Sequence, residues 1–234
     1  YVGTNIVASL VWNPLLKNIF LRRRPYFDHE TIKCLKPVHA DRDIYDISAQ
    51  GYSFPSGHST NSAALYGSLA SYKKNRILTV IAFVVPFLVG CSRFMLGVHY
   101  PTDVFAGWLL GLIAVILVSF MQKHISNQWI LHGILVLSAL PGVFYCKTED
   151  YYTSFGIMVG FFLAVHFEKR FVNFKNTRIW WKALLRIIVG ISLYFILSAV
   201  LKILFAGLPV YFGRFLRYGI VVFLLIGVYP LVFD

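Results

Sequence analysis

The sequence predicts an all-α protein, a polytopic bundle of transmembrane helices, and three observations support this prediction. Of its 234 residues, 58% are hydrophobic and 14% are charged, whereas a soluble domain usually has about 45–50% apolar and about 25% charged residues. The apolar residues form long blocks, and about 20 of them suffice for a helix to cross the hydrocarbon layer. The charges lie mostly between these blocks. A water-soluble globule and a disordered chain are therefore excluded.

The blocks predict about eight spans. The first runs from Tyr1 to about Leu21 and begins in mid-pattern without Met, so we expect a preceding segment of the gene product to be missing. The second, residues 57–72, is rich in Ser, Ala and Gly. The others are residues 77–96, 104–121, 128–145, 152–167, 183–205 and 215–233.

The charges between the blocks predict how the chain lies in the membrane. Twelve of the charged residues fall between residues 17 and 46, in a loop too polar to be a span. When this loop is discounted, one side of the alternating spans is richer in cations, and the positive-inside rule makes that side cytoplasmic. Its cations are Lys73, Lys74, Arg76, Lys123, Lys169, Arg170, Lys175, Arg178 and Lys182.

The net charge is +12, and the basic residues that produce it lie at the ends of the predicted membrane segments. There is no basic face of a soluble fold and no nucleic-acid recognition motif. We therefore expect anionic lipid headgroups, and not nucleic acid, as partners.

A first group of polar residues lies near the end of the opening block. We expect a helix up to Pro25, because the residue before a proline disfavours the helical region. Lys17 and Arg24 are seven residues apart, so they should project from one face of this helix, about 10 Å apart along its axis. Arg22 and Arg23 would then point elsewhere, and we interpret them as interfacial anchors or loop charges.

A second group, Pro55-Ser56-Gly57-His58, precedes the run of small residues. A helix that begins here has free backbone N–H groups, and its dipole favours an anion at that end. Gly57 has no Cβ to obstruct the approach of an anion the size of phosphate. His58 would sit in the first turn, where its imidazole could donate a proton to that anion.

A third group comprises Ser92-Arg93, His99, Pro101 and Asp103. Pro101 suits the first position of the next helix, which places Asp103 in its first turn and within reach of His99. A carboxylate that holds one imidazole nitrogen makes the other nitrogen a better nucleophile or base. Arg93 adds a forked donor suited to phosphate oxygens.

Taken singly, each group has a simpler interpretation. The cations could be snorkelling anchors, the Pro-Ser-Gly-His segment a plain helix start, and the pair of His99 and Asp103 a structural hydrogen bond. Together, three cations, two histidines and one carboxylate are expected on one face of the membrane. We assign no catalytic role to the other histidines, although His29 and His39 lie in the first loop near a possible headgroup.

These residues resemble the type-2 phosphatidic acid phosphatase superfamily of integral membrane lipid phosphate phosphatases, distant relatives of vanadium haloperoxidases. The family pattern is Lys, six residues, Arg-Pro; then Pro-Ser-Gly-His; then Ser-Arg, five residues, His, three residues, Asp. The three parts correspond here to Lys17–Arg24–Pro25, Pro55–His58, and Ser92–Arg93–His99–Asp103, without a departure. The resemblance covers residues 17–121. It implies an N-terminally truncated catalytic core at residues 1–127 and a C-terminal transmembrane extension at residues 128–234.

The resemblance also implies a role for each site residue. His99 attacks phosphorus, Asp103 orients His99, and His58 protonates the leaving oxygen before it assists water in hydrolysing the phosphohistidine. The phosphoryl oxygens would be held by Lys17, Arg24, Ser56, Gly57 and Arg93. No metal or other cofactor is implied.

We therefore predict an integral membrane phosphatase that hydrolyses a lipid mono- or diphosphate at the outer face of a plasma membrane, and the compact length favours a bacterial origin. A lipid phosphotransferase that uses the same histidine, a lipid transporter or scramblase with a phosphate-binding site, and a haloperoxidase are the alternatives; the spans argue against the last. The sequence leaves open which lipid is the substrate, the purpose of the C-terminal helices and the oligomeric state.

Overall fold

The computed structural model describes residues 1–174 and 177–233. In this part of the chain all regular elements are helices. They form two compact units, Tyr1–Thr148 and Glu149–Asp234, of which the last residue lies outside the described part. Lys175, one of the cations that predict the cytoplasmic side, also lies outside it. The division between core and extension expected at residue 127 stays a prediction.

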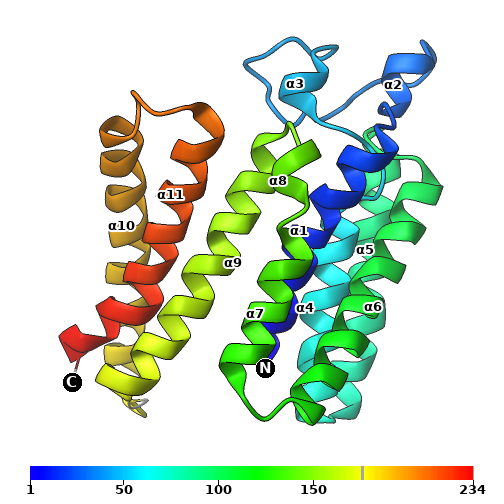
Figure 1. The fold of residues 1–234 in the computed structure, drawn as a ribbon. Helices are drawn as coiled ribbons and strands as arrows, with labels where there is room; N and C mark the ends of the chain where they lie inside the picture. Colours follow the sequence, from blue (N-terminus) through cyan, green and yellow to red (C-terminus); the bar gives the residue numbers. More distant parts are fainter. Residues whose placement is uncertain (175–176, 234) are drawn as a thin grey trace. The chain divides into compact units, whose positions relative to one another are not determined.

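The N-terminal unit is built around α4 (Gly57–Lys73), which packs against α1 (Val2–Phe20), α5 (Arg76–Met95) and α6 (Pro101–His124). The buried side chains of α4 are small, mainly Ser, Thr and Ala, so neighbouring helix backbones approach closely. Figure 1 shows these helices side by side, with the short helices α2 (Pro25–Asp28) and α3 (Ile47–Gln50) in the long loop at one end.

The last helices of this unit are α7 (Gln128–Ala139) and α8 (Gly142–Tyr145). The sequence predicts one block over residues 128–145, but the structure divides it after Ala139. Pro141 is the N-cap of α8, and because proline has no N–H it cannot continue the hydrogen-bond ladder of a helix interior.

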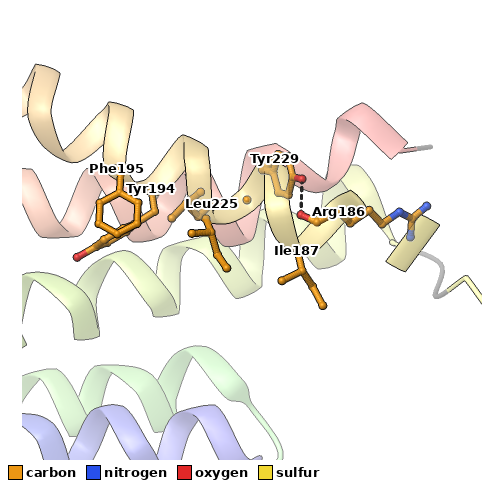
Figure 2. A pocket seen from close by; sticks show the side chains of 8 residues that line it. Arg186, Ile187, Tyr194, Phe195, Leu225 and Tyr229 are labelled. Atoms are coloured by element: carbon orange, nitrogen blue, oxygen red, sulfur yellow. Dashed lines mark hydrogen bonds between the residues drawn. The ribbon is translucent and has the colours of Figure 1, made fainter. Parts of the chain in front are cut away.

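The C-terminal unit consists of α9 (Glu149–Phe167), α10 (Trp180–Leu204) and α11 (Val210–Phe223) with shorter helical turns after two of them. A π-helical turn, η1 (Glu168–Val172), follows α9, and η2 (Leu224–Val228) and η3 (Tyr229–Phe233) follow α11. An apolar groove of about 460 Å³ runs along α10 between Arg186 and Phe195. Figure 2 shows that Tyr229 closes one side of it, where its hydroxyl donates to the backbone oxygen of Arg186 at 2.7 Å. None of the predicted site residues lines this groove.

Five helical segments in the described part are long and apolar enough to cross a membrane. They are Arg76–Met95, Pro101–His124, Gln128–Tyr145, Trp180–Leu204 and Val210–Phe233. Many of their large apolar side chains are exposed, for example Phe83 and Phe87 on α5, as expected for surfaces that face lipid. The predicted all-α, polytopic membrane fold is thus confirmed.

The other three predicted spans are also helices, α1, α4 and α9, but they are more polar. In α1 the reason is visible, because Asn5, Ser9 and Asn13 are buried inside the unit. The amide of Asn5 donates to Ser68 Oγ at 3.0 Å, and that of Asn13 donates to Thr60 Oγ1 at 3.0 Å. Polar side chains that bond across helices in this way lower the hydropathy of a segment while its outer face stays apolar.

Candidate active site

A fully buried carboxylate, Asp103, lies at the centre of the candidate site. As predicted, α6 begins at Pro101, and Asp103 is in its first turn. Its Oδ2 accepts hydrogen bonds from the backbone N–H of Tyr100, at 2.8 Å, and from the Ser53 hydroxyl. Its Oδ1 accepts from Arg22 Nη1 at 2.9 Å. These donors offset the cost of burying a charged group.

His99 stands beside this carboxylate, and the predicted contact between the two residues is confirmed. The ring is 4% exposed. Its Nδ1 lies 3.5 Å from Asp103 Oδ2 and 3.4 Å from Ser53 Oγ. Because both partners can accept a hydrogen bond, they favour the tautomer with the proton on Nδ1 and the lone pair on Nε2.

Burial lowers the pKa of His99 to about 4, even though the hydrogen bond that His99 donates to Asp103 acts in the opposite direction. The positive charges of Arg24 and Lys17 contribute further to the low pKa. The imidazole is therefore neutral at pH 7, and Nε2 carries a lone pair.

Arg22 has a specific partner that the interpretation as an interfacial anchor did not include. Its Nη1 bonds both Asp103 Oδ1, at 2.9 Å, and Thr102 Oγ1, at 2.8 Å. The guanidinium also lies over the Tyr100 ring, 3.9 Å from the ring centre. Arg22 does lie in the loop after α1, but its bond to Asp103 was not predicted, because the prediction assumed a helix that continues to Arg24.

The helix α1 in fact ends at Phe20, where Leu21 adopts a left-handed conformation. Arg24 is extended and caps α2, so the predicted shared helix face of Lys17 and Arg24 is wrong. Both cations still lie close enough to affect His99 electrostatically. The chain follows a different path from the predicted one, but the charges of Lys17 and Arg24 still act on the same site.

Arg24 is 4% exposed and is held by backbone oxygens. Its Nε donates to the carbonyls of Gln50, at 2.9 Å, and Gly51, at 3.1 Å, and its Nη1 donates to that of Val98 at 3.0 Å. A planar guanidinium can satisfy several acceptors in fixed directions. Arg24 thereby joins the long first loop to the segment that carries His99.

The second sequence group forms the N-terminus of α4, as predicted. The helix begins at Gly57, and Ser56 is its N-cap, whose hydroxyl accepts from the backbone N–H of Ser59 at 3.4 Å. The backbone N–H of Ser56 donates to the carbonyl of Asp103 at 2.9 Å. This bond ties the start of α4 to the start of α6.

His58 is exposed in the first turn of α4. Four cations contribute to the electrostatic surroundings of its ring: Lys17, Arg24, Lys36 and Arg93. Arg93 lies in the last turn of α5, and its Nε and Nη2 donate to Ser92 Oγ at 3.1 and 3.0 Å. The three sequence groups therefore meet at the end of the N-terminal unit where α1 and α5 finish and α4 and α6 begin.

Besides the role of Arg22, sequence reasoning missed three contributors to this region. Ser53 directly precedes the Phe-Pro-Ser-Gly-His segment, which could have suggested a role. Gln50 and Lys36 belong to the long loop, and no pattern in the sequence singles them out. No group of three or more His, Cys, Asp or Glu side chains that could hold a metal ion occurs in residues 1–174 and 177–233.

Comparison with known proteins defines the class to which this arrangement belongs. Residues 1–126 match the PAP2 superfamily, and residues 152–234 match the transmembrane extension of PAP2 superfamily phosphatases. The chain belongs to the PAP2 superfamily, as its three sequence groups indicate.

Several curated relatives resemble part of this chain. Phosphatidylglycerophosphatase B of Bacillus subtilis is 39% identical over 90 residues, which cover 35% of this chain and 44% of the relative. Undecaprenyl-diphosphatase BcrC of the same organism is 32% identical over 127 residues, 54% of this chain and 57% of the relative. An undecaprenyl-diphosphatase of Sulfolobus acidocaldarius is 35% identical over 109 residues, 46% of this chain and 47% of the relative. The chain spans about half the length of these relatives. No solved structure matches it.

Proposed function

We propose that this protein is a membrane phosphatase that hydrolyses a lipid phosphate or lipid diphosphate through a phosphohistidine formed on His99. The observation that carries the proposal is the buried, neutral His99, whose Nδ1 faces Asp103 and Ser53. The similar curated proteins are named as phosphatases of lipid substrates, in agreement with this chemistry.

In the first step the lone pair of His99 Nε2 attacks phosphorus, and the bond from phosphorus to the lipid oxygen breaks. The imidazole then carries a positive charge, which the Asp103 carboxylate stabilises through Nδ1–H. His58 donates a proton to the departing oxygen. In the second step water attacks the phosphohistidine, His58 accepts a proton from this water, and inorganic phosphate leaves with His99 restored.

Phosphoryl transfer depends mainly on positioning and on stabilisation of charge. Lys17, Arg24 and Arg93 provide positive charge around the two histidines. The N-terminus of α4 adds the Gly57 N–H and the Ser56 hydroxyl, and helix N-termini favour anions. We propose that these groups stabilise the phosphoryl oxygens without a metal ion.

The site-bearing end of the N-terminal unit is assigned to the outer face of a plasma membrane. The support is the positive-inside rule: the opposite end carries Lys73, Lys74 and Arg76 where α4 ends and α5 begins, and Lys123 near the end of α6. The tail of the substrate would remain in the bilayer while its headgroup enters the site.

The test is a panel of lipid phosphates in detergent, assayed for inorganic phosphate without any acceptor lipid. Wild type should release phosphate from at least one substrate, and His99→Ala should lower the rate at least about a thousandfold. His124→Ala, at the far end of α6, is the matched control and should retain activity. Activity should also survive EDTA.

Other outcomes would point to the alternatives. Phosphate transfer only when an acceptor alcohol is added would indicate a transferase. Lipid movement that persists in His99→Ala would indicate a transporter. Loss of activity on chelation, with recovery on addition of Mg²⁺, would refute the proposal of a metal-independent site.

A further inference from the structure

The long first loop places one cation, Lys36, at the rim of the site by backbone contacts on both sides of it. The Leu35 N–H donates to the carbonyl of Leu96 at 3.0 Å, three residues before His99. The N–H groups of Val38 and His39 donate to Gln50 Oε1 at 2.8 and 3.2 Å. The backbone at Lys36 is therefore fixed between the segment that carries His99 and α3.

Gln50 connects this part of the loop to the phosphate-binding cations. Its side chain is fully buried, and its Nε2 donates to the carbonyls of His39, at 2.9 Å, and Asp43, at 3.2 Å. The backbone carbonyl of Gln50 accepts a hydrogen bond from Arg24 Nε at 2.9 Å. A buried amide with all these bonds is costly to displace, so the loop has a defined position over the site.

Lys36 itself is exposed and contributes to the electrostatic surroundings of His58. Within residues 1–174 and 177–233 it forms no ion pair with a carboxylate. His58 is the residue assigned above to the leaving oxygen. Lys36 thus adds positive charge near His58, beyond that of Lys17, Arg24 and Arg93 from the three sequence groups.

We propose that Lys36 binds the second phosphate of a lipid diphosphate, the one that stays with the lipid, and that the enzyme prefers diphosphates to monophosphates for this reason. The inference rests on the proposed function. Nε2 of His99 would attack the terminal phosphorus, and the bond from that phosphorus to the bridging oxygen would break. The electron pair passes to the bridging oxygen, His58 supplies a proton there, and the lipid monophosphate departs.

The charge of the leaving group explains why one lysine would discriminate. When the substrate is a lipid monophosphate, the leaving group is an alcohol. This alcohol is neutral once protonated, so a cation next to it stabilises little. When the substrate is a lipid diphosphate, the leaving group is the lipid monophosphate. This phosphate monoester carries negative charge in both the ground state and the transition state. A charge-assisted hydrogen bond from Lys36 is available only to the second substrate.

The experiment compares farnesyl diphosphate with farnesyl monophosphate, because the tail is then the same. The variants are Lys36→Met, which keeps most of the aliphatic stem, Lys36→Arg, which restores the charge, and Lys33→Met, which removes another exposed cation of the same loop. Lys36→Met should lower kcat/KM for the diphosphate about fivefold to tenfold and for the monophosphate less than about twofold. Lys36→Arg should recover most of the loss, and Lys33→Met should resemble wild type.

Two further measurements separate the charge effect from handling of the lipid tail. The preference of wild type for the diphosphate should shrink at high salt, because exposed charges are screened. Inorganic pyrophosphate should inhibit competitively, and its inhibition constant should rise about fivefold in Lys36→Met while that of orthophosphate changes little.

Equal loss on both substrates, or no loss on either, in Lys36→Met would overturn this inference while the phosphatase assignment stands. An equal effect of Lys33→Met would overturn it too, because the loop charge in general would then be responsible. If wild type hydrolyses neither substrate nor any other lipid phosphate, the proposed function itself fails.

Discussion

The N-terminal unit buries a network of polar side chains, whereas the C-terminal unit packs mainly through apolar side chains and glycines, with polar contacts of partly exposed arginines such as Arg217 to Ser198. Asp103, Arg24, His99, Gln50 and Ser53 are all buried in the first unit. In the described part of the second, Ser198 is the only buried polar residue. Burying polar groups is costly unless they are paired, and paired groups hold a site in one geometry.

The helices α9 and α11 of the C-terminal unit illustrate the contrast. A Cβ added to Gly160 would collide with the backbone oxygen of Gly219, so these two helices touch through their backbones. Packing of small residues is a general way to associate helices in a membrane, where no hydrophobic force draws them together. The second unit therefore has the features of a membrane scaffold, and catalysis is expected to depend on the first.

The largest difference between the units is expected for histidines. His58→Ala should lower turnover of an ordinary lipid phosphate about a hundredfold to ten thousandfold, because a general acid is lost. His166→Ala, in α9 of the second unit, should change turnover less than about twofold. Steady-state release of phosphate measures both.

The leaving group provides a sharper check on His58. A substrate with an acidic leaving group, such as a nitrophenyl ester, needs little protonation, so His58→Ala should lose much less activity on it. A loss of the same size on both kinds of substrate would contradict the assignment of His58 as the acid.

The second prediction concerns the stability of the first unit against pH. His99 has a folded pKa of about 4, below the unfolded value of about 6.5. Between these values the unfolded chain binds a proton that the folded chain excludes, so stability is lost as the pH falls through this window. The shift corresponds to about 3 kcal/mol, roughly two orders of magnitude in the folding equilibrium.

This loss can be measured by denaturant unfolding in detergent at pH 7, 5.5 and 4.5, in wild type and in His99→Gln. The variant lacks the titrating ring, so its curve should fall less over this range. Parallel curves for the two proteins would mean that His99 is solvated in the folded state, which would also weaken its role as a neutral nucleophile.

The third prediction concerns Arg22, which donates a hydrogen bond to Oδ1 of Asp103. Hydrogen bonds to charged groups contribute about 1.5–3 kcal/mol, so Arg22→Ala should lower kcat about tenfold to a hundredfold. KM should change little if Arg22 positions Asp103 and does not hold substrate. Thr102→Val, which removes the other partner of Arg22 Nη1, is the control and should cost much less. A rise in KM with kcat unchanged would instead identify Arg22 as a substrate ligand.

Arg22 also shows where sequence reasoning reaches its limit. The contact of His99 with Asp103 could be predicted, because the two residues are four apart around a helix start marked by Pro101. The place of Arg22 could not, because it depends on the chain leaving the helix at Leu21 and not at Pro25. Proline indicates where a helix cannot continue, but it does not show that the helix continues that far.

The same limit applies to the long loop. The apolar blocks and the three sequence groups are local patterns, and local patterns predicted the helices and the residues that gather at one end. The position of Lys36 depends on Leu35 bonding Leu96, which lies in a distant segment, and on Gln50 bonding His39 within the irregular loop. Such contacts have no periodic signal, which is why Gln50 and Lys36 were missed.

The smallest expected effect comes from a matched pair of glycines, one in each unit. A Cβ on Gly107 would lie 2.6 Å from the backbone oxygen of Ser56, the N-cap of α4, and a Cβ on Gly160 would collide with the backbone of Gly219. Replacing either with Ala should therefore cost about 1–3 kcal/mol of stability through overpacking, seen as a lower Tm in detergent. The two substitutions add the same methyl group, but Gly107 lies against the start of α4 at the site, whereas Gly160 lies in the second unit.

Their activities should separate. Gly107→Ala pushes on the turn that holds Ser56 and His58, and small displacements of reacting groups slow catalysis, so we expect kcat per folded molecule to fall about fivefold. Gly160→Ala should leave kcat within about twofold. If Gly160→Ala lowered kcat as much as Gly107→Ala, the second unit would be shaping the site, and the view of it as a scaffold without influence on catalysis would have to be abandoned.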